Sequence, residues 1–170
     1  MSAPADTSPS AGWLDGREHV LPVRIYYEDT DFTGVVYHGN YARYFERGRS
    51  ESLRACGVLH TDLLARDPPS AFTVVRLEID FKRPARIDDA LLVRTSYEAV
   101  RGPRLIIGQR IVRDGELLAQ AKVTAAFIDL SGRPRKPPLA LVDALRPLFA
   151  SETAVSQQAL TTLRAKAGKS

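Results

Sequence analysis

The stretch Tyr27–Arg49 reads YEDTDFTGVVYHGNYARYFERGR. Two carboxylates, Asp29 and Asp31, precede the one histidine of this stretch, His38, and a helix-like run begins at Asn40. The stretch therefore combines a strand end, an acidic turn and a helix start. A helix N-terminus offers unpaired N–H donors and the positive end of the helix dipole, so this stretch is the first candidate for a functional site.

The residues that follow are expected to form a helix over Asn40–Cys56, because apolar and small residues recur there at three- and four-residue spacings. Asn40 suits the N-cap, and Gly57 suits the C-terminal stop. Gly48 lies on the apolar face although glycine is a poor helix former, which indicates a close approach to another part of the backbone.

Downstream of the helix the apolar residues alternate with polar ones, which predicts half-buried antiparallel strands. The expected strands are Phe72–Lys82, Leu91–Val100, Arg104–Arg113 and Glu116–Asp129, preceded by an extended segment at Val20–Tyr27. In the first of them, the expected apolar face comprises Thr73, Val75, Leu77, Ile79 and Phe81. Asp114-Gly115 is a two-residue hairpin signal.

Two short helical segments complete the expected elements, at Thr61–Arg66 and at Leu139–Ala150, the latter interrupted by Pro147. The sequence thus predicts an α+β fold in which an antiparallel β-sheet wraps around one long central α-helix. Such a sheet leaves an edge strand open, which favours dimerisation through that edge.

The length of 170 residues fits one domain. We expect a flexible N-terminal tail over residues 1–16, a folded domain over 17–150 and a flexible C-terminal tail over 151–170. The start of the chain lacks the pattern of an export signal, and no apolar run is long enough to span a bilayer. The single cysteine, Cys56, excludes an intrachain disulfide and fits a cytoplasmic protein.

The net charge of +4 comes from arginines scattered along the chain rather than from a basic cluster. Binding to nucleic acid is therefore not expected. The mild positive excess suits a phosphate-bearing small ligand as well as it suits plain solubility.

The chain resembles a known family, the hot-dog-fold acyl-CoA thioesterases of the 4-hydroxybenzoyl-CoA thioesterase type, and within it the YbgC branch that is associated with the Tol-Pal envelope system. The resemblance spans roughly residues 20–148. The residues that carry it are Arg24 to Asp31, Gly34 to His38, Asn40-Tyr41, Tyr44 to Arg47, Phe81, Pro84 to Arg86, Asp88-Asp89 and Arg133 to Arg135.

The resemblance implies an enzyme that hydrolyses acyl-CoA to a free acid and CoA. By position, Asp31 matches the catalytic carboxylate, His38 a residue associated with activity, and Tyr27 a site position. It also implies a dimer or a tetramer built from dimers, with active sites at the subunit interface. CoA is part of the substrate, so no cofactor is expected.

The residues themselves suit this chemistry. Asp31 can attack the thioester carbonyl or activate a water molecule, and the sequence leaves both routes open. Backbone N–H groups from about Tyr37 to Asn40 are expected to bind the oxyanion. His38 can orient water, donate a hydrogen bond to the thioester or protonate the leaving thiolate. Gly34 and Gly39 are expected to let the backbone pass close to the substrate.

Asp29 is interpreted as a turn residue, and one histidine beside two aspartates lacks the ligand spacing of a metal site. The rival catalytic carboxylate is Glu46 on the expected helix, which otherwise orients the helix start or pairs with an arginine. Candidates for the CoA phosphates flank a turn or cluster in a loop, and they are Arg101, Arg104, Arg133, Arg135 and Lys136.

Two other functions stay open. The chain can be a non-catalytic protein that binds acyl groups or acyl carrier protein, or a scaffold linked to the Tol-Pal system. It can also be a hydratase or dehydratase, although the spacing from Asp31 to His38 favours the thioesterase.

Overall fold

The computed structural model describes residues 10–150, so residues 1–9 of the expected N-terminal tail and the whole expected C-terminal tail, residues 151–170, lie outside the described residues. The elements follow the order β1 (Trp13–Asp15), β2 (Glu18–Arg24), η1 (Tyr27–Asp29), α1 (His38–Ala55), α2 (His60–Leu64), β3 (Ser70–Phe81), β4 (Ala90–Arg101), β5 (Arg104–Arg113), β6 (Glu116–Asp129), α3 (Leu139–Ala144) and η2 (Arg146–Leu148).

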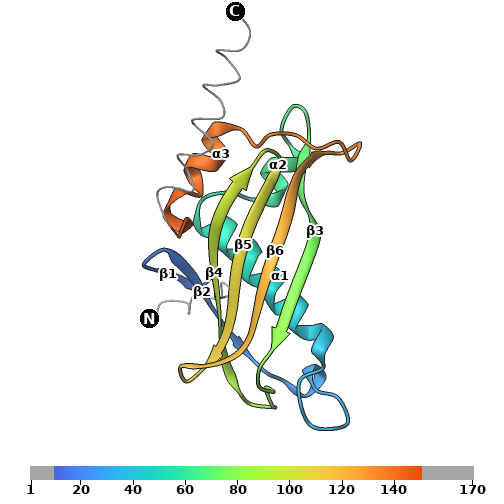
Figure 1. Cartoon of the computed structure of the whole chain (residues 1–170), viewed down its shortest axis with the longest axis vertical. Coiled ribbons are helices and arrows are strands. Elements are labelled where there is room, and N and C mark those ends of the chain that lie inside the picture. The colour runs from blue at the N-terminus through green and yellow to red at the C-terminus, as the bar shows by residue number, and fades with distance from the viewer. Residues whose placement is uncertain (1–9, 151–170) are drawn as a thin grey trace, which may run out of the picture.

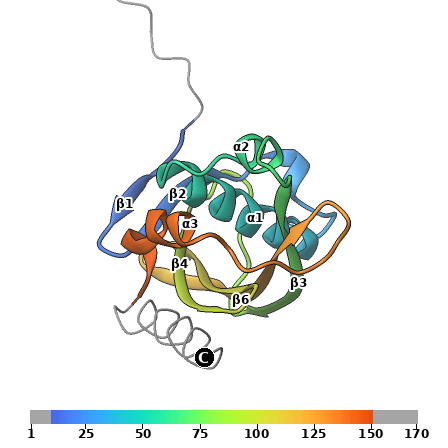
Figure 2. The same ribbon diagram turned by 90° about the horizontal axis from the view of Figure 1, so that it is seen from above.

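One antiparallel sheet contains all six strands, in the order β1-β2-β4-β5-β6-β3. Helix α1 crosses one face of this sheet, and the view from above shows the sheet curving around it (Figures 1 and 2). The predicted α+β architecture of a sheet wrapped around a long helix is therefore confirmed.

The buried face of α1 follows the predicted spacing. Its fully buried members include Tyr44, Phe45 and Ser52, and Gly48 faces the sheet with them. The helix ends at Ala55, and Gly57 follows it as the predicted stop. Its φ of +74° suits glycine, and its N–H donates to the Arg54 carbonyl at 2.9 Å.

The central strands alternate as the sequence predicts. On β4, Leu91, Val93 and Tyr97 are fully buried and lie on the face that packs against α1. Strands β5 and β6 are joined by Asp114-Gly115, and both residues have the positive φ values that this hairpin turn requires. These strands form the main wall of the hydrophobic core.

Strand β3 departs from the prediction. Its expected apolar face is largely uncovered within one chain, with Val75 53%, Leu77 37% and Phe81 52% exposed. The reason is its position, because β3 is an edge strand that pairs with β6 alone, and its register shifts between Val74 and Arg76. An alternating strand pattern cannot distinguish a face buried in the core from one left for another surface.

Several predicted boundaries are wrong. Part of the expected N-terminal tail, Trp13–Asp15, is strand β1, since it pairs with β2 in a tight hairpin. The extended segment ends at Arg24, and Tyr27 belongs to a 3₁₀ turn. Helix α1 begins at His38, so Asn40 is not its N-cap.

The closing segment is also shorter than expected. Helix α3 ends at Ala144 and a 3₁₀ turn follows, with Pro147 in its first positions. No helix among the described residues is long and apolar enough to cross a membrane.

Candidate active site

The turn between η1 and α1 carries Asp31. The Asp31 N–H donates to the Val35 carbonyl at 2.9 Å, and the Gly34 N–H donates back to the Asp31 carbonyl at 3.0 Å. Gly34 has a φ of +80°, which explains why this position of the three-residue turn is a glycine. The turn thus fixes the backbone of Asp31 at the tip of a small hairpin.

The carboxylate of Asp31 is held in its charged form. Its Oδ1 accepts hydrogen bonds from the Thr33 hydroxyl at 2.5 Å and from the Thr33 N–H at 2.8 Å. These two bonds, and then the nearby His38, lower the pKa of Asp31 below its ordinary value. The second oxygen, Oδ2, has no hydrogen-bond partner among the described residues and is free to meet a substrate or water.

Asp29 has the structural role that was expected of it. Its carboxylate accepts the Tyr26 N–H at 2.8 Å, and its carbonyl accepts both the Tyr37 N–H and the Asn40 side-chain amide at 2.9 Å. Asp29 therefore ties the 3₁₀ turn to the start of α1.

These bonds narrow the choice of oxyanion donors. The N–H groups of Tyr37 and Asn40 already donate, to the carbonyls of Asp29 and Tyr37 respectively. The N–H groups of His38 and Gly39 open the helix and have no backbone partner among the described residues. The expected set from Tyr37 to Asn40 thus reduces to two donors.

The side chains around these donors are accessible. Tyr27 is 84% exposed, and Tyr37 is 50% exposed with its ring 4.5 Å from the His38 ring, centroid to centroid. A Cβ on Gly39 would lie 2.6 Å from the Tyr37 ring, so this glycine makes room for that ring. His38 is exposed, and its imidazole has no hydrogen-bond partner among residues 10–150.

Glu46 lies apart from Asp31. It stands two turns beyond His38 on α1, about 12 Å along the helix. Its carboxylate accepts the Ser50 hydroxyl at 2.7 Å, and the expected ion pair with an arginine is absent among the described residues. It is among the residues that line a cavity of about 110 Å³, together with Phe72, Leu105 and Ile107.

The β4–β5 turn and the loop after β6, which carry the five basic candidates for CoA phosphates, lie at the far end of the sheet from the segment that leads into α1 (Figure 1). The Asp31 turn adjoins the start of β4, whereas Arg101 ends that strand, and 12 residues of strand span about 40 Å. The Arg135 guanidinium is moreover paired with Asp129 at 2.8 Å. Within one chain, these cations do not come together with Asp31.

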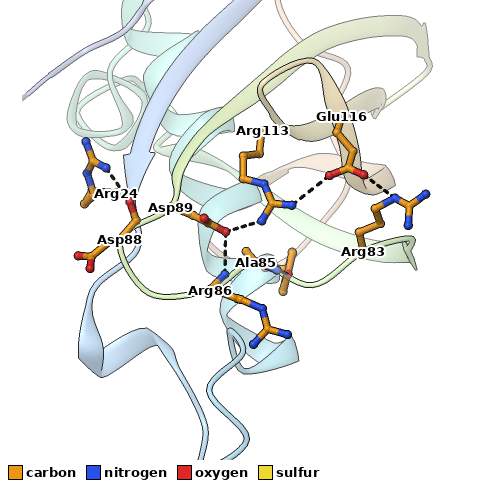
Figure 3. A network of polar contacts seen from close by, with 9 residues as sticks. Arg24, Arg83, Ala85, Arg86, Asp88, Asp89, Arg113 and Glu116 are labelled. Carbon is orange, nitrogen blue, oxygen red and sulfur yellow. Dashed lines mark hydrogen bonds and ion pairs between the residues drawn. The ribbon is translucent and has the colours of Figure 1, made fainter.

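A polar network that the sequence did not assign lies close to the Asp31 turn. Figure 3 shows Asp89 between the backbone of Arg86 and the guanidinium of Arg113, which also contacts Glu116. The only sequence signal for this network was that residues between Pro84 and Asp89 belong to the family resemblance, which assigned them no role.

No group of three or more His, Cys, Asp or Glu side chains among the described residues is arranged to hold a metal ion. The candidate site combines one ionised carboxylate, one accessible imidazole and two N–H groups at a helix start that have no backbone partner among the described residues. This combination suits hydrolysis of an ester or thioester, and the long helix wrapped by one antiparallel sheet is the hot-dog fold.

Comparison with known proteins agrees. The sequence profile of the thioesterase-like superfamily matches residues 25–149, and the chain belongs to this superfamily. It is 43% identical over 110 residues to the acyl-CoA thioesterase YbgC of Haemophilus influenzae, covering 65% of this chain and 80% of that protein.

Two further relatives are similar over more of the chain. The acyl-CoA thioester hydrolase YbgC of Escherichia coli O6:H1 is 41% identical over 123 residues, covering 71% of this chain and 90% of that protein. The crystal structure of a probable thioesterase from Bartonella henselae superposes with a TM-score of 0.69 at 41% identity, covering 71% of this chain and 99% of the other.

Proposed function

We propose that this protein hydrolyses acyl-CoA thioesters and that Asp31 is its catalytic carboxylate. The observation that supports this most directly is the Thr33-bonded carboxylate of Asp31, with one free oxygen, in the turn that leads into α1. The names of the YbgC relatives support the substrate class.

Two routes are open to Asp31. As a nucleophile, its free oxygen bonds to the thioester carbonyl carbon and the carbon–sulfur bond breaks, giving a mixed anhydride and the CoA thiolate. Water then cleaves the anhydride and restores the carboxylate. As a general base, Asp31 takes a proton from water as the water oxygen bonds to the carbonyl carbon, and the carbon–sulfur bond then breaks to give the free acid and the CoA thiolate.

The helix start serves both routes. The His38 and Gly39 N–H groups can donate to the oxyanion that forms at the carbonyl oxygen, and each such donor contributes about 10²–10³ in rate. The exposed imidazole of His38 can deliver a proton to the leaving thiolate. The reaction needs no metal or cofactor.

A second copy of the chain completes the site in this proposal. Strand β3 is an edge strand with exposed Val75 and Leu77, and Phe32 at the tip of the Asp31 turn is fully exposed. Apolar groups around an open strand edge favour pairing with another copy. In such a dimer or tetramer, distant basic residues of one copy, such as Arg101 and Arg104, approach Asp31 of a neighbouring copy.

The experiment is hydrolysis of a panel of acyl-CoAs and an acyl carrier protein thioester, followed by released thiol. We expect hydrolysis by the wild type, a loss of about 10²-fold or more in Asp31→Asn and near wild-type rates in Glu46→Gln. Full activity in Asp31→Asn with loss in Glu46→Gln would transfer the role to Glu46. Binding of these thioesters without hydrolysis would instead favour the acyl-binding or Tol-Pal scaffold function.

The cytoplasmic location is likewise a proposal, supported by the single unpaired cysteine.

A further inference from the structure

The loop between β3 and β4 contacts both ends of the segment that carries Asp31. At the start of that segment, Ile25 and the loop exchange two backbone hydrogen bonds of 3.0 Å, with Asp88 and Asp89. At its end, the Val36 N–H donates to the Ala85 carbonyl at 2.9 Å. The loop residues 85–89 therefore set the distance between the two ends of the catalytic segment.

The loop also fixes this segment against α1. The Ala85 N–H donates to the Tyr41 hydroxyl at 3.0 Å, and Tyr41 is buried in the first turns of α1. One residue thus contacts both the end of the Asp31 hairpin and the helix whose start offers the N–H groups of His38 and Gly39.

Asp89 closes this loop. Its Oδ2 accepts the Arg86 N–H at 2.8 Å and the Arg113 guanidinium at 2.6 Å (Figure 3). The neighbouring Asp88 has a φ of +68°, a conformation that a non-glycine residue keeps only where its surroundings impose it. The Arg113 side chain comes from the end of β5, so the ion pair anchors the loop to the rigid sheet.

We propose that Asp89, anchored by Arg113, is a positioning residue that sets the place of the Asp31 carboxylate relative to the start of α1. This inference rests on the proposed role of Asp31. The Asp89 carboxylate bonds to the backbone of Arg86, and Arg86 forms an antiparallel β-bridge with Val35. The Val35 carbonyl in turn accepts the Asp31 N–H at 2.9 Å.

The first link in this chain of contacts joins the Asp89 carboxylate to the backbone of Arg86, and the next two join backbone segments, so a shift of the loop is transmitted to the Asp31 turn. A misplacement of about 1 Å can lower a catalytic rate by about 10²-fold. Asp89 has no need to touch the substrate for its loss to be felt in the chemical step.

The first test compares Asp89→Asn with Glu116→Gln in acyl-CoA hydrolysis. Each substitution removes one carboxylate partner of Arg113, but Glu116 contacts the loop through Arg83, which lies outside the residues 85–89 that bond to the Asp31 segment. We expect kcat to fall by about 10- to 100-fold in Asp89→Asn, with KM and the thermal midpoint close to those of the control. If Asp89→Asn does not fold, Arg113→Gln tests the anchor instead, because it removes the Arg113 bond to Asp89 and leaves the Asp89 bond to Arg86 in place; Glu116→Gln then controls for the loss of the Arg113–Glu116 pair. A wild-type kcat in Asp89→Asn would overturn the proposal.

The second test separates positioning from general damage. In an Asp31→Asn background, Asp89→Asn should change the residual rate by less than about threefold, because its effect passes through Asp31. A fully multiplicative loss would contradict this. Hydrogen exchange at the Asp31 and Val36 amides should quicken in Asp89→Asn and not in Glu116→Gln.

This exchange measurement does not depend on activity. If Asp31→Asn proved fully active, the proposed catalytic role of Asp31 would fail, while faster exchange would still show that Asp89 holds the turn. Unchanged exchange in Asp89→Asn would overturn the positioning role itself, whatever the activity of Asp31→Asn.

Discussion

Gly48 on α1 approaches Val93 on β4 so closely that a Cβ at this position would lie 2.7 Å from the Val93 Cγ1 atom. Thr95 and Gln109 are nearly as close, at 3.0 and 3.2 Å from the same point. The Gln109 side chain also donates to the Phe45 carbonyl at 2.9 Å, so this contact joins helix and sheet at their crossing. The sequence predicted a close approach of Gly48 to another part of the backbone; the atoms that come close are instead side-chain atoms of the sheet.

We predict that Gly48→Ala destabilises the protein although alanine is the better helix former by about 1 kcal/mol. Val93 is fully buried and stiff at χ1, so the added methyl group forces an overpacking that costs about 1–3 kcal/mol. Thermal unfolding should show a midpoint lower by a few degrees.

The matched control is Gly108→Ala on β5. A Cβ there would meet only the carboxylate of Glu98, the far end of a flexible side chain. We expect this variant to unfold at or above the wild-type midpoint. An equal decrease in both variants would contradict the argument from the helix crossing.

Gly34 gives a second prediction, because its φ of +80° lies in the left-handed region. Gly34→Ala should cost about 1–2 kcal/mol through this strain, although no atom lies within 4 Å of the new methyl group. Since the strain falls on the turn that holds Asp31, acyl-CoA hydrolysis should fall as well.

Gly16→Ala is the control for this pair of effects. Gly16 has a φ of +59°, equally open surroundings and a position in the β1–β2 hairpin, away from Asp31. We expect a similar loss of stability, measured by urea unfolding, with kcat retained. Equal losses of kcat would show that the turn at Gly34 has no special relation to the reaction.

Features of the fold that arise from a local sequence pattern could be predicted, whereas features that arise from contacts between distant residues could not. Local alternation was enough for β4, β5 and β6, because one face of each packs on α1. The start of α1 was misplaced by two residues because the backbone there is satisfied by a tertiary bond, from the Tyr37 N–H to the Asp29 carbonyl, rather than by a side-chain cap. The strand Trp13–Asp15 exists through its pairing with β2, which no local pattern signals.

The same distinction applies to the site. The turn of Asp31 and the helix after it are contiguous in sequence, so residue type and spacing were informative. The anchoring pair joins Asp89 in the β3–β4 loop to Arg113 at the end of β5, and only the folded chain brings the two side chains to 2.6 Å. The distance of the basic loop residues from Asp31 was hidden for the same reason.

Thr33 controls the charge of Asp31 in a further prediction. Its hydroxyl and its N–H both stabilise the carboxylate and lower the pKa of Asp31. Thr33→Val removes the hydroxyl donor, so the pKa should rise and the acid limb of the pH profile of kcat/KM should move to higher pH.

Thr33→Ser keeps a hydroxyl at the same place and is the matched control. Its acid limb should coincide with that of the wild type. A profile that is unmoved in Thr33→Val would mean that another group, rather than Asp31, sets the acid limb.

The buried side chain of His19 leads to a prediction of how the free energy of unfolding depends on pH. Its side chain is fully buried, with Nε2 donating to the Ala11 carbonyl at 2.8 Å and Nδ1 lacking any partner among the described residues. Burial lowers the pKa of His19, because a proton on Nδ1 would be buried without an acceptor. The hydrogen bond to Ala11 and the charge of Glu51 oppose this effect and raise the pKa. As pH falls below about 6.5, the unfolded chain binds this proton before the folded protein does, so the free energy of unfolding should decrease toward acid pH and be constant above it. Urea unfolding at a series of pH values should show this decrease in the wild type and in His60→Gln, whose histidine is exposed, and a smaller one in His19→Gln. An identical pH dependence in all three proteins would assign the acid sensitivity to other groups.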